Sequence, residues 1–507
     1  MSENGIEQRA DLGDRSRQPA GTPPEAMTGS SNESGAEPTQ TLADIDWETT
    51  RYLSAATQLD LRYARFVVRR IIGEPLRAVA PAAGADIVVV TRWALAALHR
   101  RAWRDAVLAC LLLLVVFTSL ITWSWIPIPI VTMLAIATVG YERWIRDVKI
   151  ISRLMLRGRF RARDAPHSKS DRIEQRLDTV KQQQSGNLVV FRGRRAFVGS
   201  GSRVLHSRIL INSGLGKKGS GGKRKNPIKF TTAELHEALE SSLKEMGFTE
   251  LRVGERLFVN GEHVAAEKRL LPDEFSPPVA AAPEDLLLKG CINPTPEART
   301  YLCAEIGGWK GQLVVSLFAR AVQANGSLQV EWLFNGLPPL HSTLLRIDQR
   351  YEQHTIRQLA RAAVTGVTVV IPAWLASPVM YARYAIIPLV DRIQQRNIQY
   401  RIRNGYVFNY GSTRSIREGA IGYRRAHDFV VGDELTFIYL AEHTMLRALR
   451  RFLKAHNIDM KQFDKQAQTL IKKVNKYSVG KVEGENVAIG SKARIDSSKK
   501  SEPTGAK

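Results

Sequence analysis

The chain has 507 residues, of which 44% are hydrophobic and 24% charged, and 73 Lys and Arg against 49 Asp and Glu give a formal net charge of +24. Its three cysteines, Cys110, Cys291 and Cys303, are too few and too widely spaced for a disulfide-rich scaffold or a zinc module with paired thiols. The basic excess fits nucleic acid, anionic lipid or the flanks of a membrane span, so the position of the charges has to decide.

The N-terminal region divides into a tail and a helical part. Residues 1–45 are rich in Ser, Gly, Pro, Glu and Thr and lack large apolar residues, which predicts a disordered tail. In the juxtamembrane region 46–105, apolar residues at helical intervals from Tyr52 to Ile72 predict a basic amphipathic helix that ends near Gly73. This helix either packs on a cytoplasmic domain or lies on anionic headgroups. A second short helix or re-entrant element is expected at residues 87–98.

An uncharged apolar run follows at residues 106–141. From Ala106 to Gly140 it contains no Asp, Glu, Lys, Arg or His, and its 35 positions exceed the roughly 20 residues that one span needs. Two Trp residues and two Pro residues between positions 123 and 129 mark a turn, because Trp prefers the water interface and Pro is excluded from helix interiors. The sequence therefore predicts a transmembrane helical hairpin with spans at about 106–123 and 126–141.

The flanks of this hairpin are strongly basic on both sides. Under the positive-inside rule both flanks are cytoplasmic, which predicts a multi-pass protein with both termini in the cytoplasm. A helical hairpin buried in a soluble core is the alternative. The residues expected at the membrane interface are Trp123, Trp125, Arg101, Arg104, Arg143 and Arg146.

The region after the hairpin is predicted to hold a basic juxtamembrane helix at 142–185 and a cytoplasmic domain at 186–440. Strands are expected between Asn187 and Ile211, from Leu251, and three times between 299 and 340, with a helix that begins at Thr231 or Thr232. The fold class is therefore α+β, with the transmembrane hairpin joined to a mixed, largely antiparallel cytoplasmic α/β portion. Glycine-rich pieces at 199–201 and 214–225 lack the order of a dinucleotide or phosphate-binding loop.

A second apolar stretch lies at residues 362–382. It contains Pro372 and Pro378, and arginines flank it on both sides, which a single span could not satisfy. We interpret it as a buried or membrane-apposed segment, with a third span as the alternative. A basic helical segment at 441–476 and a Gly- and Lys-rich tail at 477–507 complete the chain.

No catalytic, cofactor-binding or metal-binding residue is predicted. The histidines are scattered, without an HExxH motif or a nearby cysteine in the sequence. The densest polar cluster is NYGSTRSIRE at Asn409–Glu418, where Arg414 and Arg417 are candidates for binding a phosphate or carboxylate. A turn followed by a capped helix explains the same residues.

Several segments together resemble an uncharacterised set of actinobacterial-type integral membrane proteins of unknown function. They are FVGSG at 197–201, AELHEAL and ERLFVNG, YLCAEI with LVVSLFAR, NYGSTRSIRE, and FLKAHNID at 452–459. The resemblance covers most of the chain after about Arg51. It implies a bacterial cell membrane location and brings no activity and no catalytic residue.

The expected function is that of a non-enzymatic, membrane-anchored cytoplasmic binding or scaffold module. Its expected partners are the lipid bilayer and either a protein partner or further copies of the chain, and no cofactor is expected. The alternative is a membrane-tethered binder of nucleic acid or anionic lipid through the basic segments. Enzyme activity ranks third, and a pocket that gathers Arg414, Arg417 and a carboxylate of shifted pKa would favour it.

Overall fold

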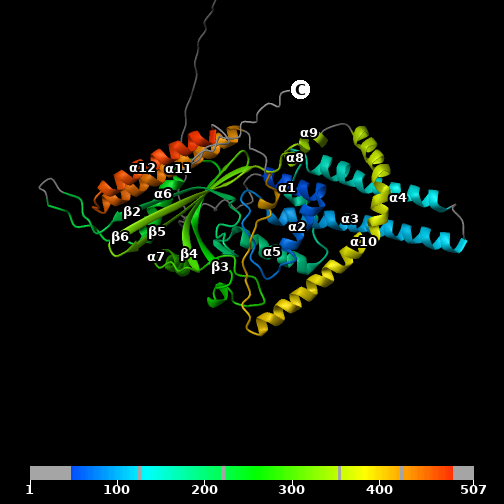
Figure 1. Cartoon of the computed structure of the whole chain (residues 1–507), viewed down its shortest axis with the longest axis horizontal. Helices are drawn as coiled ribbons and strands as arrows, with labels where there is room; N and C mark the ends of the chain where they lie inside the picture. Colours follow the sequence, from blue (N-terminus) through cyan, green and yellow to red (C-terminus); the bar gives the residue numbers. More distant parts are fainter. Residues whose placement is uncertain (1–46, 123–126, 219–222, 352–354, 423–427, 483–507) are drawn as a thin grey trace, which may run out of the picture. The chain divides into compact units, whose positions relative to one another are not determined.

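The computed structural model describes residues 47–122, 127–218, 223–351, 355–422 and 428–482 (Figure 1). The predicted N-terminal tail, Trp123, Trp125 and most of the C-terminal tail lie outside these ranges. The described part is mixed α and β and contains one six-stranded sheet.

The sheet has the order β1-β3-β4-β5-β6-β2. Its strands are β1 (Leu188–Phe191), β2 (Ser202–Asn212), β3 (Leu251–Asn260), β4 (Ala298–Gly308), β5 (Leu313–Ala324) and β6 (Ser327–Leu337). Strands β1 and β3 pair in parallel, and the other neighbours are antiparallel. The predicted strands and hairpins are confirmed, whereas the pairing of β2 with β6 joins segments that are far apart in the sequence.

Helices cover one face of the sheet (Figure 1). They are α6 (Thr232–Lys244), α11 (Asp428–Ala455) and α12 (Lys461–Val482), and the short α7 (Glu284–Ile292) lies beside α6. Helix α6 begins where predicted, because Thr231 and Glu234 form a reciprocal capping box. Helices α11 and α12 contribute to the main core, so the boundary predicted at residue 440 is wrong and this helical segment belongs to the sheet domain.

The N-terminal helices form a second core next to the sheet domain. The predicted single helix is two helices, α1 (Trp47–Leu59) and α2 (Leu61–Ile71), because Asp60 caps the second through the amide of Arg62. Apolar residues of α1 and α2 pack on the start of α3 and on α5 (Asp171–Ser185). Packing on protein therefore accounts for the apolar face of this region.

The apolar hairpin consists of α3 (Ile87–Thr122) and α4 (Pro127–Trp144). Helix α3 is continuous, so the separate element expected at residues 87–98 is its first part. Helix α4 continues as a π-helix over Ile145–Ser152, and a 3-10 turn at Ala162–Asp164 precedes α5, so region 142–185 is several elements and not the one helix predicted. Among the described residues, three helical segments have the length and composition to cross a membrane: Ile87–Ile121, Ile128–Ser152 and Val367–Arg403.

Paired charges lie at the base of the hairpin. Glu142 forms an ion pair with Arg100 at 3.4 Å, and Arg104 forms one with Asp105 at 2.6 Å. Arg101 is buried and donates to the carbonyl oxygen of Gln58 at 2.6 Å. Arg146 pairs with Asp147 at 2.7 Å. These arginines thus have protein partners, and the headgroup contacts expected of them and of Arg143 stay a prediction.

The second apolar stretch belongs to a helix of 49 residues, α10 (Thr355–Arg403), which follows the short α8 (Ser342–Leu345) and α9 (Ile347–Tyr351). It is continuous through Pro372, Pro378 and Pro388 and packs on both α3 and α4 (Figure 1). Ile371, Leu375 and Val379 are 61%, 65% and 69% exposed, so the buried interpretation is wrong for these side chains.

The covered face of the sheet should dominate the stability of the domain. Phe334 is fully buried there, and Phe334→Ala should lower the free energy of unfolding by about 3–5 kcal/mol through lost burial and a cavity. Urea denaturation of the detergent-solubilised chain, followed by circular dichroism, measures this change. Leu210→Ala on β2, where the side chain is 53% exposed, is the control and should stay within about 0.5 kcal/mol. Equal losses in the two variants would contradict this account of the core.

Candidate ligand-binding pocket

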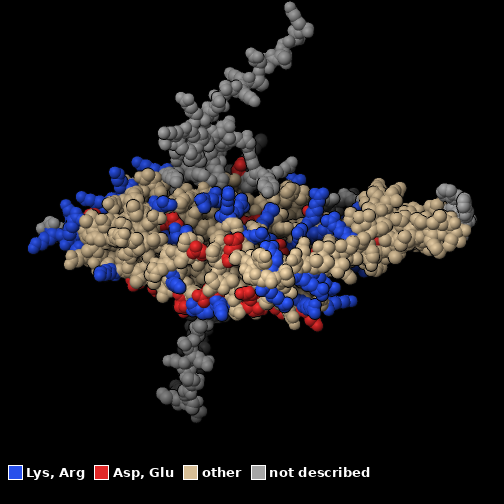
Figure 2. All heavy atoms as spheres, turned by 60° about the horizontal axis from the view of Figure 1, so that its bottom comes forward, with Lys and Arg blue, Asp and Glu red and all other residues tan. Residues whose placement is uncertain are grey.

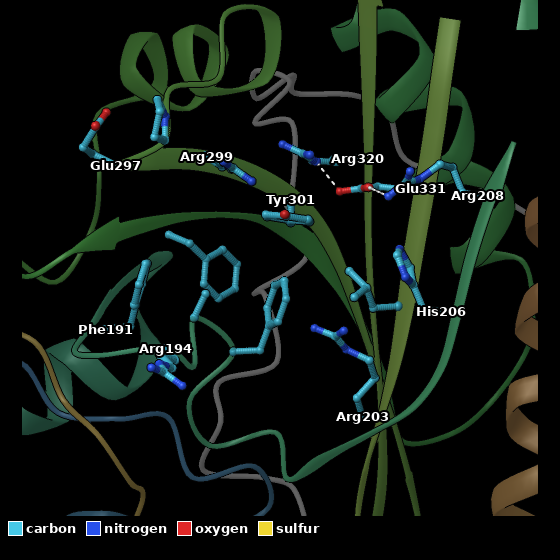
Figure 3. A pocket seen from close by; sticks show the side chains of 15 residues that line it. Phe191, Arg194, Arg203, His206, Arg208, Glu297, Arg299, Tyr301, Arg320 and Glu331 are labelled. Carbon is cyan, nitrogen blue, oxygen red and sulfur yellow. Dashed lines mark hydrogen bonds and ion pairs between the residues drawn. The ribbon is translucent and has the colours of Figure 1, made fainter. Parts of the chain in front are cut away.

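The second face of the sheet carries a cavity of about 450 Å³, a size common among small-molecule sites (Figure 3). It opens over β2, β4, β5 and β6 and under the loop that joins β1 to β2. Its lining consists of Phe191, Arg194, Ala196, Phe197, Arg203, His206, Arg208, Phe258, Pro296, Glu297, Arg299, Tyr301, Arg320, Glu331 and Leu333. Aromatic rings and arginines dominate this set.

The aromatic side chains form one packed cluster at the floor. The ring of Phe197 stacks on Phe318 at 4.3 Å between centroids and meets the edges of Phe258 and Tyr301 at 5.2 and 5.1 Å. Phe258 and Tyr301 are buried, whereas Phe191 is partly exposed at the margin. The cavity therefore offers flat apolar surface beside open solvent, to which a planar ring can stack.

Five arginines and two glutamates line the cavity, so its walls are positive. Glu331 is almost buried and binds Arg320 at 2.5 Å and Arg208 at 3.7 Å, which neutralises part of this charge. Arg194 and Arg203 make no ion pair with a residue in the described ranges, and both are exposed. In Figure 3 Arg203 reaches into the cavity from the side of β2.

Tyr301 supplies a phenol to this site. Burial raises the pKa of Tyr301, and the nearby guanidinium of Arg320 opposes the shift only in part. The guanidinium carbon of Arg320 lies 5.6 Å from the centre of the Tyr301 ring. The hydroxyl therefore stays protonated at neutral pH and can donate a hydrogen bond.

The loop that carries Phe197 is fixed by the segment NYGSTRSIRE. One carboxylate oxygen of Glu418 accepts bonds from the amides of Gly199 and Gly201, each at 3.3 Å, and the other accepts from the amide of Ser415 at 2.8 Å. Both glycines have a positive φ and stand against backbone carbonyls of other segments, which excludes a side chain at either position. The GSG piece is therefore a tight structural turn.

The predicted anion-binding residues of this segment have structural partners. Arg417 is fully buried and donates to the carbonyl oxygens of Ala83 and Gln312, the latter at 2.8 Å. Burial lowers its pKa to about 9 although Glu305 opposes this. Arg414 is exposed and donates to the carbonyl oxygen of Glu418 at 2.7 Å. The geometry gives Arg417 a role in holding the fold, and anion binding by this pair stays a prediction.

Within the described part of the chain, one group of side chains could hold a metal ion. His236 of α6, Glu255 of β3 and Cys291 of α7 place their ligand atoms within 4.8 Å of one another. Nδ1 of His236 lies 2.7 Å from the Glu255 carboxylate and 3.4 Å from the sulfur of Cys291. Both partners approach the same ring nitrogen, so this is not a relay in which a histidine bridges a carboxylate and a nucleophile. Hydrogen bonding that ties α6 to β3 and α7 accounts for the group.

Comparison with known protein families adds one assignment. A model described as an AbeC-like domain matches residues 209–490. The chain belongs to the AbeC-like domain family. No curated protein and no solved structure matches the chain.

The AbeC-like domain includes most of the sheet, α10, α11 and α12. Its matched range begins inside β2 at Ile209, so Arg299, Tyr301 and Arg320 lie within it, whereas Phe197 and Arg203 precede it. The apolar hairpin precedes it as well. The cavity thus combines residues of the AbeC-like domain with a loop that this chain supplies ahead of it.

The cavity was not predicted from the sequence. Its residues come from six strands and two loops, and no spacing rule relates Arg203 to Arg299 or Arg320. The local signal is the i, i+2 spacing of Arg299 and Tyr301 in β4 and of Glu331 and Leu333 in β6, because it places a charged residue and an apolar or aromatic residue on the same face of each strand. The group of His236, Glu255 and Cys291 could not be predicted either, because its residues come from three separate elements.

The buried histidine predicts a pH-dependent stability. Burial alone lowers the pKa of His236, but the bonds to Cys291 and Glu255 outweigh it and raise the pKa to about 9. A raised pKa stabilises the fold fully below the unfolded value near 6.5, and the contribution is lost as the pH rises to about 9. The free energy of unfolding of the native chain should therefore exceed that of His236→Gln by a margin that shrinks, by at most about 3 kcal/mol, between pH 6.5 and 9.5.

Denaturation at several pH values measures this margin. His263→Gln, which changes an exposed histidine, is the control and should follow the native chain across the range. A margin that is constant or grows with pH would show that His236 is neutral in the folded protein.

Proposed function

We propose that the chain is a membrane-anchored binding protein whose sheet pocket takes a small ligand that combines a planar ring with phosphate. The observation that carries the proposal is the pairing of an aromatic floor with five arginines in one cavity. Guanidinium groups bind phosphate through charge-assisted, often bidentate hydrogen bonds, and aromatic faces stack on planar rings. A nucleotide is the ligand class that meets both demands.

Binding without chemistry is the function that this lining favours. The lining residues include no Ser, Thr or Cys that could act as a nucleophile. The arginine pair with no ion-pair partner in the described ranges, Arg194 and Arg203, leaves positive charge that an anion would neutralise. A scaffold role would not require such charge to gather in a cavity.

The membrane anchor rests on the exposed surface of the hairpin. Leu113, Phe117 and Leu120 of α3 are 64%, 64% and 70% exposed, and α4 exposes Ile130 and Met133. In Figure 2 the projecting ends of these helices, at the right, are almost uniformly uncharged. Exposed apolar patches of this kind mark membrane or protein contacts, and two helices of sufficient length favour the bilayer. We assign the chain to the bacterial cell membrane, with both termini in the cytoplasm.

Calorimetric titration of the detergent-solubilised full chain tests the ligand. ATP and GTP are the probes, with adenosine and inorganic phosphate as the two halves, and each half should bind more weakly than the whole. Arg203→Ala and Arg299→Ala should each raise the Kd about tenfold or more, because a hydrogen bond to a charged group contributes about 1.5–3 kcal/mol. Arg172→Ala, an exposed arginine on α5, is the matched control and should leave the Kd unchanged.

Two results would overturn the ligand assignment. One is the absence of binding of either nucleotide by the native chain. The other is tight, salt-sensitive binding of a short single-stranded RNA that Arg203→Ala and Arg299→Ala leave unaltered, which would favour the basic segments as a nucleic-acid surface.

Reporter fusions test the anchor and its orientation. Alkaline phosphatase fused after residue 125 should be active, because it would lie outside the cytoplasm, whereas fusions at either terminus should be inactive. Green fluorescent protein should give the reverse pattern, and the chain should sediment with membranes after a carbonate wash. Active phosphatase at one terminus, or release by the wash, would contradict the hairpin topology.

A further inference from the structure

Helix α10 has the length and composition of a membrane span, yet its two ends belong to the same folded body. The chain just before α8 pairs with the chain after α10, because Leu340 bridges Ile421 and the amide of His341 donates to the carbonyl oxygen of Ala420 at 3.1 Å. Strand β6 and helix α11, which lie on either side of α10 in the sequence, share one core. If the hairpin is in the membrane, α10 crosses it an even number of times.

Two crossings do not fit the helix. Its 49 residues extend about 74 Å at 1.5 Å per residue, and a return would need a sharp turn inside the bilayer. The structure describes one continuous helix instead. Its second half also contains Arg383, Asp391, Arg392 and Arg396, charges that a second span would have to bury in hydrocarbon. The number of crossings that remains is zero.

The contacts of α10 place it along the base of the hairpin. The indole of Trp374 donates to the carbonyl oxygen of Leu108 at 3.0 Å, and Val370 packs with Leu108 in a small buried cluster. Further along, the hydroxyl of Tyr384 accepts from Arg65 of α2 at 3.4 Å. Near its end, the guanidinium carbon of Arg403 lies 5.5 Å from the ring centre of Phe275. The helix thus runs from the apolar hairpin onto the water-soluble body.

One face of α10 carries a continuous apolar stripe. At 100° per residue, positions 371, 375, 379, 386, 390 and 393 fall within about 100° of one another on the helix. All six side chains are Ile, Leu or Val and are between 42% and 69% exposed. The buried residues Val370 and Ser377 fall on another face. The stripe therefore has no cover among the residues that the structure describes.

The bilayer surface is the occupant that suits this stripe. The stripe lies on a helix that packs against both apolar helices, α3 and α4, and the buried cluster at Leu108 and Val370 holds the opposite face of α10 against them. Arg383, Arg392 and Arg396 accompany it, and long cationic side chains beside an apolar face extend toward anionic headgroups.

We infer that α10 lies in the membrane interface, parallel to the bilayer, with the stripe immersed and the body of the protein above it. The inference rests on the proposed membrane anchor and deepens it: the AbeC-like domain is laid on the membrane along α10 and is not a free domain on a tether. Interfacial helices of this kind bury their apolar face about 5–10 Å deep.

Spin labels report this depth. The full chain with Cys110→Ala, which keeps the two buried thiols, is labelled at one introduced cysteine and reconstituted in vesicles of neutral and anionic phospholipid. Val379→Cys, Ile386→Cys and Ile393→Cys sample the stripe, and Asp391→Cys samples another face. Collision with oxygen and with a water-soluble nickel chelate gives the depth of each label. The three stripe labels should share one shallow depth, and the label at 391 should contact water.

Hairpin labels separate failure of this inference from failure of the anchor. Leu113→Cys and Leu134→Cys should lie deep in the hydrocarbon whatever the placement of α10. If the hairpin labels lie deep but the depth of the stripe labels changes steadily along α10, then α10 spans the membrane and the inference is wrong. If the stripe labels are shielded from both reagents and show spin–spin coupling between two chains, a second copy of the chain covers the stripe. That result would also overturn the inference. If the hairpin labels contact water, the anchor itself fails.

Discussion

The backbone pairing of the segment after α10 with the rest of the sheet domain is the constraint on which the architecture depends. Ser412 exchanges hydrogen bonds with Val190 and Arg192 at 3.0 and 2.9 Å, and Leu340 bridges Ile421. These bonds hold residues from both sides of α10 in one body, while the second core joins residues from both sides of the hairpin. The hairpin of α3 and α4 must therefore begin and end on one side of the body's membrane surface, and so must α10. Local hydropathy identifies three candidate spans, but this closure limits how they can be used.

The two faces of the sheet differ in what they bury. The covered face holds Leu, Ile, Val and aromatic residues against three helices, which is the usual arrangement for a stable domain. The face that carries the cavity contains charged residues. Arg256 and Glu305 form an ion pair at 2.5 Å on this face, and five arginines line the cavity. Buried or clustered charge contributes little net stability, so its presence in an otherwise regular sheet is an argument for the proposed binding function. The contrast between the faces is the physical basis of the proposed site.

The sequence revealed those features that local rules determine. The hairpin, the strands, and the capped start of α6 at Thr231 each follow from contiguous residues, and all are present. The cavity, the His236 group and the burial of Arg417 depend on which segments become neighbours in the fold. The pairing of β2 with β6, for example, is not predicted by any local pattern. The length of helix α10 could not be predicted for a related reason. Its prolines and charged residues predict a short, interrupted apolar segment, whereas packing on α3 and α4 accompanies one continuous helix.

The segment NYGSTRSIRE connects helix α10 to the pocket. It begins at Asn409, after α10 has ended at Arg403. It pairs through Ser412 with the strand that carries Phe191 and holds the loop of Phe197 through Glu418. Phe191 and Phe197 line the cavity, so the position of α10 and the shape of the aromatic floor are set by one short, hydrogen-bonded piece of chain. A ligand can alter the membrane contact only through a difference in affinity between two positions of this piece. Because Arg417 is buried and bound to two backbone carbonyls there, such a change would have to break those bonds, which opposes any coupling between the proposed membrane contact and the proposed site.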